Sequence, residues 1–542
     1  MWKGSILLAV LMMGCAVTAQ PVSDPLTEGI ALLQKGDVPH ALILLRQAVK
    51  QKPGSARAHN YYGFALGQSG AVAQAVVEFQ KALDIDPEYP DALYNLGAAL
   101  AIEDQYTDAI EKLKAALALR PNFPEAQFEL GNALAARGKI DDAIEALETA
   151  VRQRPDMYVA YAQLALLNSR MGNTQGALDD FRRVVALQPG SAEAHNNLGV
   201  ALDQTGDLAG AIVEFQKALA RNPKFVAGLL NLAQAMRDKG DLPAAIENYR
   251  KAIALNPDSA DAHADLGFTL KRVDRVPEAL KEVSMAVQLA PNLARAQFYY
   301  GEILAQMGDN AGAVPHYERA CQLSPRDPEF RLKYGSVLAL KSPSDGVREL
   351  EEAARLAPQR ADILTALGAA LRRAGNQERA AEVFRQSREV SAAMAQRSEA
   401  MLETNKAIDS LKKGQVAPAI ESLRAALALD PAFADANHYM GIAQSAQQNW
   451  PEANRAFNAA LQESPSNPEI HFNFAVSLQK QGDWDGAARE FQSVVDLRPG
   501  QVPVMCQLAD ALSRAGQIER AQAELQRAKE LGSCDAVQGK AH

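Results

Sequence analysis

Small, apolar and polar residues follow one another in an order that recurs about every 34 residues along the chain. We count each repeat from 31 residues before the proline that closes most of them, and the eighth place is then glycine or alanine, as in Gly63 and Gly97; in the tenth repeat the glycine, Gly335, comes one place later. The twentieth place is alanine in every repeat but one, where it is Gly346. Helices approach closely only where side chains are small, and large apolar residues fill the space beside the contact. The pattern therefore predicts two packed helices in each repeat.

Turn-forming residues mark the ends of these predicted helices. Pairs such as Gly206-Asp207 combine a residue that tolerates the left-handed conformation at a helix end with one that caps the next helix. A stacked repeat protein is indicated by a fixed period of this length, because each unit then buries its apolar face against its neighbours. The period is also seen, with two departures, in the closing prolines Pro53, Pro87, Pro121, Pro155, Pro189, Pro223, Pro257, Pro291, Pro325, Pro358, Pro431, Pro465 and Pro499.

One repeat shows the whole pattern: "AHNNLGVALDQTGDLAGAIVEFQKALARNP", residues 194–223. The Leu-Gly of its first helix, the alanine and aromatic of its second and its final proline resemble the tetratricopeptide repeat. The resemblance covers about fifteen units within residues 22–535. It implies an all-α fold, a right-handed superhelical solenoid of helix-turn-helix repeats.

The array is interrupted once, where residues 377–413 contain neither glycine nor proline. Two interpretations remain open, a single long helix or two helices with a bend near 391–398. A single helix would carry an apolar stripe made of Val383, Val390, Met394, Met401 and Ile408. We divide the chain accordingly into eleven repeats at 22–394, an insertion at 395–399, four repeats at 400–535 and a tail at 536–542.

The amino terminus has the features of a secretory signal peptide over residues 1–19. An early lysine precedes an apolar stretch, and small residues before the predicted cleavage point after Ala19 suit signal peptidase. The stretch is short for a membrane span, and we predict no integral membrane segment. A periplasmic or secreted bacterial protein is expected; the alternative is an outer-membrane lipoprotein anchored through lipid at Cys15.

Net charge and motifs exclude several classes of function. The formal net charge of −9 disfavours general binding to nucleic acid, which needs clustered positive charge. We find no phosphate-binding loop, no zinc motif and no nucleophile elbow, so we predict no enzyme, no cofactor and no metal site. Recurrent histidines fit this view, because they share the fourth place of their repeats and are explained by packing: His59, His195, His263 and His471.

In tetratricopeptide proteins the first helices line a concave face on which extended peptides lie. The resemblance implies such a surface here, where asparagine amides would bind a peptide backbone and aromatic rings would form apolar pockets. Further cations could hold acidic side chains. The alternative is that these residues only solvate the helices. The inward positions are Asn60, Phe64, Tyr94, Asn95, Phe128, Asn132, Asn196, Asn197, Asn231, Arg237, Lys271, Arg272, Arg372 and Arg373.

Two cysteines flank the last predicted hairpin. Cys506 lies near the start of its first helix and Cys534 just after its second, so antiparallel helices bring them to the same end. A disulfide and two separate thiols are both compatible with this placement.

These observations predict a scaffold that binds proteins or extended peptides, in the assembly or organisation of an envelope or secretion complex. The alternative function is a carbohydrate-binding or cell-wall-binding accessory subunit of an enzyme encoded elsewhere.

Overall fold

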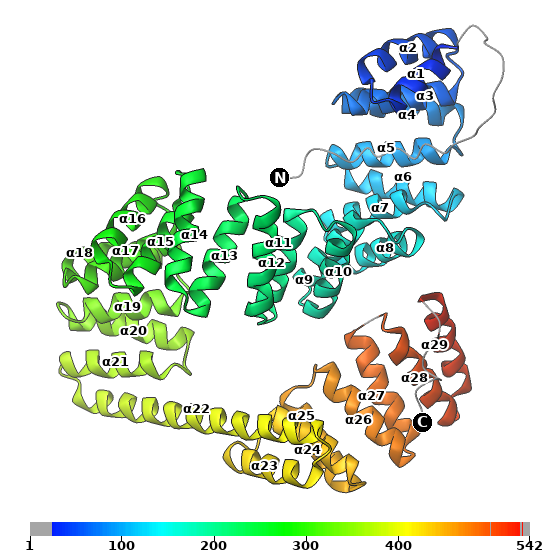
Figure 1. Cartoon of the computed structure of the whole chain (residues 1–542). Coiled ribbons are helices and arrows are strands. Elements are labelled where there is room, and N and C mark those ends of the chain that lie inside the picture. The colour runs from blue at the N-terminus through cyan, green and yellow to red at the C-terminus, as the bar shows by residue number, and fades with distance from the viewer. Residues whose placement is uncertain (1–23, 499, 532–533, 535–542) are drawn as a thin grey trace. The chain divides into compact units, whose positions relative to one another are not determined.

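The computed structural model describes residues 24–498, 500–531 and 534 of the chain. These residues fold into 29 α-helices, and no β-strand occurs among them. Figure 1 shows the helices following one another as packed pairs. The predicted signal peptide at 1–19, the alternative anchor at Cys15 and the tail at 536–542 lie outside the described residues.

Contacts divide the chain into two compact units, Met1–Leu323 and Ser324–His542. The helices of the first unit are α1 (Pro25–Gln34), α2 (Val38–Gln51), α3 (Ala56–Gln68), α4 (Val72–Ile85), α5 (Pro90–Ile102), α6 (Tyr106–Leu119), α7 (Pro124–Ala136), α8 (Ile140–Gln153), α9 (Tyr158–Arg170), α10 (Thr174–Leu187), α11 (Ala192–Gln204), α12 (Leu208–Arg221), α13 (Val226–Lys239), α14 (Leu242–Leu255), α15 (Ala260–Arg272), α16 (Val276–Leu289), α17 (Ala294–Gln306) and α18 (Asn310–Leu323). Those of the second unit are α19 (Pro328–Leu338), α20 (Pro343–Leu356), α21 (Ala361–Arg373), α22 (Gln377–Lys412), α23 (Val416–Leu429), α24 (Ala434–Ala446), α25 (Trp450–Glu463), α26 (Pro468–Gln481), α27 (Trp484–Leu497), α28 (Val502–Arg514) and α29 (Ile518–Leu531).

The residues that recur in the sequence make the close contacts inside each hairpin. In the sixth repeat, a Cβ atom on Gly199 of α11 would lie 2.6 Å from the ring of Phe215 in α12. Ala211, in the twentieth place, has no exposed surface. Between the two helices Gly206 has a φ of +84°, and the carboxylate of Asp207 accepts a hydrogen bond that caps α12. Small residues, an aromatic filler and a glycine turn thus make the hairpin that the pattern predicts.

The tenth repeat explains the one glycine in the twentieth place. This repeat is one residue short, and its two helices are α19 and α20. A Cβ atom on Gly346 would lie 2.5 Å from the Cβ of Ala339, which follows α19 directly. Any larger residue would therefore collide with the end of the shortened helix.

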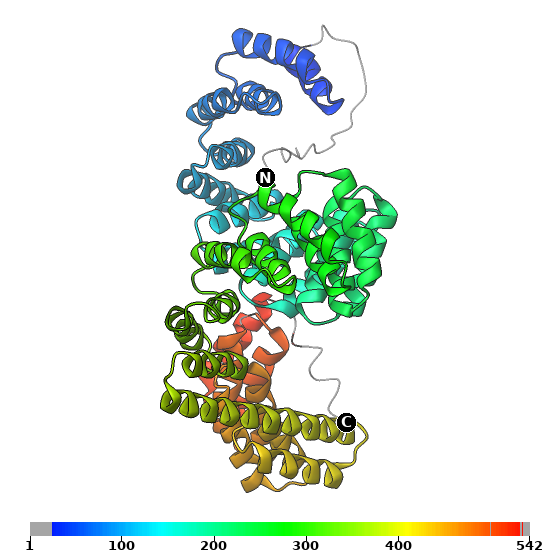
Figure 2. The ribbon, with the colours of Figure 1, turned by 90° about the vertical axis from the view of Figure 1, so that its left-hand side faces the viewer.

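Residues 377–412 form one continuous helix, α22, which is the first of the two alternatives for this segment. Its amino end is capped by the side chain of Asn376. The predicted apolar stripe is buried at Val383, but residues 391–399 are all exposed, and Met394 and Met401 remain 57% and 53% exposed. The middle of this helix is therefore open to solvent, and Figure 2 shows α22 as one long, unbroken ribbon.

The two ends of α22 belong to different hairpins. Its first half packs against α21 and its second half against α23, with separate buried clusters at each end. The 29 helices therefore form fifteen hairpins, as predicted. The division into compact units falls between Leu323 and Ser324, whereas the sequence-based boundary at 395–399 lies inside one unit, because α22 joins the repeats on either side of it. None of the described helices is long and apolar enough to cross a membrane.

Candidate functional site

First helices of successive repeats contact one another as well as their own partners. In the first compact unit α11 contacts α13 and α15 contacts α17, and in the second unit α22 contacts α24. Contacts of similar extent between successive second helices are absent from the described residues. We call the surface on which the first helices meet the inner face; it carries the fifth, sixth, ninth, twelfth and thirteenth places of each repeat.

Four of the predicted asparagines link one repeat to the next across the inner face. The side-chain amide of Asn95 donates to the carbonyl oxygen of the Asn60 side chain at 2.9 Å, and Asn231 donates to Asn196 at the same distance. Each amide has two donor hydrogens and an acceptor oxygen, so one bond leaves part of it for another molecule. These asparagines therefore have a structural role, and their contact with a bound backbone stays a prediction. Asn197 is exposed beside them.

The predicted aromatic residues do not form open pockets. Phe64, Tyr94 and Phe128 are 6%, 7% and 4% exposed, and the Tyr94 ring packs 4.9 Å from that of Phe123. Their places face the gap between neighbouring first helices, where a large ring is covered on both sides. The expectation that these three rings supply binding pockets is wrong, because they belong to the core.

Two of the predicted cations, Arg237 and Lys271, are engaged in ion pairs within the first compact unit. The guanidinium of Arg237 lies 3.4 Å from the carboxylate of Asp265, and the ammonium of Lys271 lies 2.5 Å from that of Glu302. All four side chains are less than one fifth exposed. Burial raises the pKa of Asp265, although Arg295 and Arg237 act in the opposite direction.

Aromatic rings complete this group of side chains. Arg237 and Lys271 both lie over the ring of Phe268, at 5.7 and 5.9 Å from its centroid, and that ring stacks on Tyr299 at 4.5 Å. Such contacts add to the ion pairs, because a ring face attracts a cation. We call this group the charged cluster; it consists of Arg237, Asp265, Phe268, Lys271, Tyr299 and Glu302.

The other predicted cations remain exposed. Arg272 donates only to the main-chain carbonyl of Arg237, at 3.4 Å. In the second compact unit Arg372 lies over the ring of Phe384, and Arg373 is exposed. None of these three cations pairs with a carboxylate among the residues that the structure describes. They are therefore open to an anionic partner.

Acidic and aromatic members of the inner face were missed by the sequence interpretation. Asp265 and Tyr299 occupy the sixth place, while Phe268 and Glu302 occupy the ninth. A further one, Glu129, occupies the sixth place in α7 and is partly buried. Reading the sixth and ninth places for every residue type, rather than for asparagine and cations, would have found all of them.

The recurrent histidines act as links inside the repeats. In each case one ring nitrogen lies 2.6–2.7 Å from a glutamate of the second helix, and the other lies 2.9–3.3 Å from the carbonyl of the proline before the repeat. Among the described residues, no group of three or more His, Cys, Asp or Glu is placed to hold a metal ion. These are the packing contacts of His59, His195, His263 and His471.

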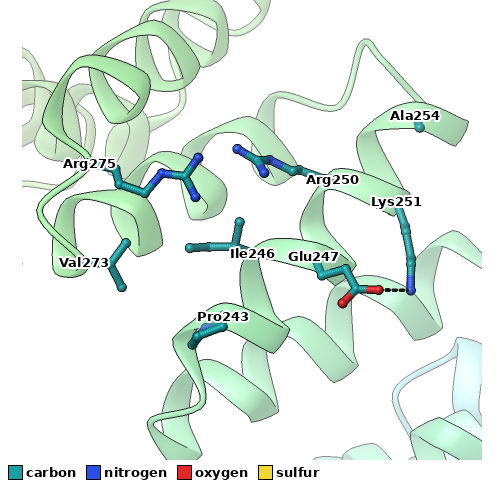
Figure 3. Close-up of a pocket in the computed structure, with 8 residues that line it drawn as sticks. All are labelled: Pro243, Ile246, Glu247, Arg250, Lys251, Ala254, Val273 and Arg275. Atoms are coloured by element: carbon teal, nitrogen blue, oxygen red, sulfur yellow. Dashed lines mark ion pairs between the residues drawn. The ribbon is translucent and has the colours of Figure 1, made fainter.

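A pocket of about 570 Å³ lies away from the inner face, between α14 and the turn before α16. Figure 3 shows Arg250 and Arg275 extending toward one another beside Ile246. Both guanidinium groups already pair with the carboxylate of Glu278, at 2.9 and 2.7 Å. A second ion pair on the rim joins Glu247 to Lys251. The cations of this pocket are thus neutralised by the chain itself.

A carboxyl group with a strongly raised pKa, that of Asp180, lies on α10 beside α9. Burial raises the pKa of Asp180 to about 7; a hydrogen bond from Asn168 at 2.9 Å opposes the shift, while Glu148 and Asp179 add to it. A folded-state pKa above the unfolded value of 3.8 means that the ionised group costs stability as pH rises.

Asp180→Asn should therefore stabilise the protein at alkaline pH. The gain in the free energy of unfolding is expected to be about 2 kcal/mol larger at pH 8 than at pH 5, because the wild-type carboxyl ionises in that interval. Urea unfolding at both pH values measures it. Asp179→Asn removes the same charge from an exposed neighbour and should change the pH dependence much less, because Asp179 makes the smallest of the named contributions to the raised pKa of Asp180; an equal change in both variants would refute the assignment.

Cys506 of α28 and Cys534, which follows α29, are joined by a disulfide in the structure, with their Cα atoms 5.8 Å apart. Both side chains contact the apolar cluster of the last repeats. Cys321 is buried in α18, outside this bridge.

Comparison with known proteins agrees with the repeat pattern. Models described as "TPR repeat" match residues 66–102 and 233–274. Models described as "Tetratricopeptide repeat" match residues 100–166, 162–225, 294–337, 336–393, 404–468, 439–502 and 478–533. No curated protein matches the chain significantly.

Several solved structures resemble parts of the chain. A crystal structure of MamA is 28% identical over 30% of this chain and 95% of its own length, with a TM-score of 0.29. YrrB, described as a TPR protein with an unusual peptide-binding site, is 22% identical over 32% of this chain and 91% of its own, with a TM-score of 0.29. Pseudomonas aeruginosa pilF is 20% identical over 38% and 94%, with a TM-score of 0.35.

Each family match falls on helices that pair as the 34-residue pattern requires. From its sequence, its helix hairpins and these models, the chain belongs to the tetratricopeptide repeat family.

Proposed function

We propose that this chain is an exported scaffold that binds extended segments of partner proteins along its inner face. The observation that carries the proposal is the composition of that face. Its asparagines retain unused hydrogen-bonding groups. Asn197 is exposed on α11, and Arg272 is exposed on α15, the first helix two repeats later. A row of amides suits an extended chain, because each amide can donate to and accept from a peptide backbone at once.

Family membership supports protein partners, and the repeat fold points to a non-catalytic protein. The features of residues 1–19 support export, and an exported scaffold with many repeats suits the assembly or organisation of an envelope or secretion complex. The inner faces of the two compact units carry different side chains. Amides dominate the early repeats, and exposed arginines occur at Arg372 and Arg373. Different segments, or different partners, would be bound by the two units.

Pull-down from the organism's own envelope extract tests the proposal. The mature chain is the bait, and recovered proteins are quantified by mass spectrometry. The double variant Asn197→Ala with Arg272→Ala should recover partners with about thirtyfold lower affinity and unfold at an unchanged temperature, since two exposed contacts of about 1 kcal/mol each are lost.

The matched control carries Lys281→Ala and Gln288→Ala, two exposed residues on the second helix α16. It should bind as the wild type does. Equal recovery by the inner-face variant and by wild type would refute the inner-face proposal, and recovery of glycan without protein would favour an accessory carbohydrate-binding role instead.

A further inference from the structure

Glu129 is a partly buried carboxyl on the inner face of α7, without a basic partner. Its carboxyl group is hydrogen-bonded to the Asn132 side chain on the next turn of the same helix. Tyr94 on α5 is its titratable neighbour, and Arg154, which follows α8, is ion-paired with Glu125 instead. The described part of the chain places no lysine, arginine or histidine within ion-pair distance of this carboxyl.

The charged cluster provides an internal comparison. Asp265 occupies the same sixth place four repeats later. Two guanidinium groups approach its carboxylate, that of Arg237 from the previous repeat at 3.4 Å and that of Arg295 from the next at 3.6 Å. Four repeats earlier, the places of these two arginines are occupied by Ala101 and Val159. The inner face of the early repeats thus keeps the carboxyl group and lacks both of its counter-charges.

The side chains beside Glu129 are also smaller than those beside Asp265. The ninth and twelfth places around Asp265 hold Phe268 and Lys271, whose side chains lie against one another. The same places around Glu129 hold Asn132 and Ala135. A long side chain that reaches Glu129 along the inner face therefore meets short, uncharged neighbours. The repeats that carry Glu129 and Asp265 share one backbone arrangement and differ here in the side chains that surround the carboxyl group.

We propose that Glu129 receives a basic side chain, a lysine or arginine carried by a partner segment that crosses α5, α7 and α9. This inference rests on the proposed function, because it specifies one contact of the bound segment. A buried carboxylate without a counter-charge is stabilised by a cation that brings its own hydrogen-bond donors. The amide oxygens of Asn95 and Asn132 can accept the remaining N–H groups of such a cation. The partner segment is thereby expected to carry a positive charge where it passes Glu129.

Binding of n-butylguanidinium to the full mature chain tests this site without any partner protein. Ligand-observed saturation-transfer NMR at pH 8 compares it with n-butylurea, which has a similar shape and no charge. The cation should bind at least tenfold more tightly than the urea. Glu129→Gln should abolish that preference, whereas Asp265→Asn, which removes the same charge four repeats away, should retain it.

The wild-type chain supplies a second measurement that needs no substitution. Burial raises the pKa of Glu129 to about 7, so lowering the pH from 8 to 5 should remove most of the preference for the cation. Tyr94, which faces this region, stays uncharged over that interval, because burial raises its pKa. Arg154 is held in its ion pair with Glu125. A preference that survives in Glu129→Gln, or one that is unchanged at pH 5, would overturn the proposal.

The two proposals fail separately. Loss of the guanidinium preference in wild type, with partners still recovered through Asn197 and Arg272, would refute the Glu129 site alone. Suppose instead that n-butylguanidinium binds as expected, but the double variant Asn197→Ala with Arg272→Ala recovers as much partner protein as wild type. That result would refute the proposed function alone.

Discussion

Ala211→Glu is expected to destabilise the sixth and neighbouring repeats by about 3–5 kcal/mol. Ala211 has no exposed surface, and its helix α12 packs tightly against α11 through Gly199 and the ring of Phe215. A glutamate there would place an unpaired carboxylate between two helices, or force the helices apart. The nearest buried side chains, such as Ile212, are apolar and offer the carboxylate no hydrogen bond.

Ala209→Glu is the matched control, because Ala209 lies two residues earlier in the same helix and is exposed. This variant should unfold within about 0.5 kcal/mol of wild type. Hydrogen exchange measured by mass spectrometry on peptides covering 212–219 distinguishes the two. Unchanged protection in Ala211→Glu would contradict the packing of the hairpin.

The loss of protection should be local. A stacked array is stabilised mainly by the repeats themselves and by contacts between nearest neighbours. Amides of α11 to α14 should exchange faster, while those of α1 to α4 should be unaffected.

Most of the fold could be predicted because its determinants are local in the sequence. A small residue such as Gly199, its filler Phe215 and the turn glycine Gly206 lie within one repeat, so their spacing describes the whole hairpin. Repetition of this spacing then predicts the stacking. The continuity of α22 could not be decided in the same way, because residues 391–399 are all exposed and carry no buried apolar pattern that would favour a bend or a straight course.

The candidate site was less predictable, because its contacts cross from one repeat to the next. Asn60 and Asn95 lie 35 residues apart, and their bond depends on how two first helices meet, which no single repeat reveals. The same dependence on packing between repeats explains why the ring of Phe64 lies in the core and does not line a binding pocket. It also explains why Arg237 is paired, since its partner Asp265 belongs to the following repeat.

Differences between repeats carry the functional information. The 34-residue pattern makes the sixth place equivalent in every first helix, yet this place is asparagine at Asn95 and Asn231 and acidic at Glu129 and Asp265. Packing does not require these changes, since successive first helices contact one another whether the sixth place is asparagine or acidic. The sixth place therefore presents different polar groups along the inner face, and a bound segment would need side chains that match them.

Reduction of the bridge between Cys506 and Cys534 is expected to destabilise the last repeat by about 3 kcal/mol. The two residues are 28 apart in sequence, and closing a loop of that length lowers the entropy of the unfolded chain by about this amount in the loop-entropy model. The effect should be concentrated at the end of the array, because among the described helices none follows α29 to cover it. An exported protein meets the oxidising conditions in which such a bridge persists.

Non-reducing peptide mapping of the purified protein decides whether the bridge is present. When the chain is denatured without reductant, iodoacetamide should modify Cys321 and leave Cys506 and Cys534 unmodified. The variant Cys534→Ser should lose protection in α28 and α29 to the extent that reduction causes in wild type, while Cys321→Ser should retain it. Alkylation of Cys506 in unreduced wild-type protein would show that the last repeat is held by its apolar contacts alone.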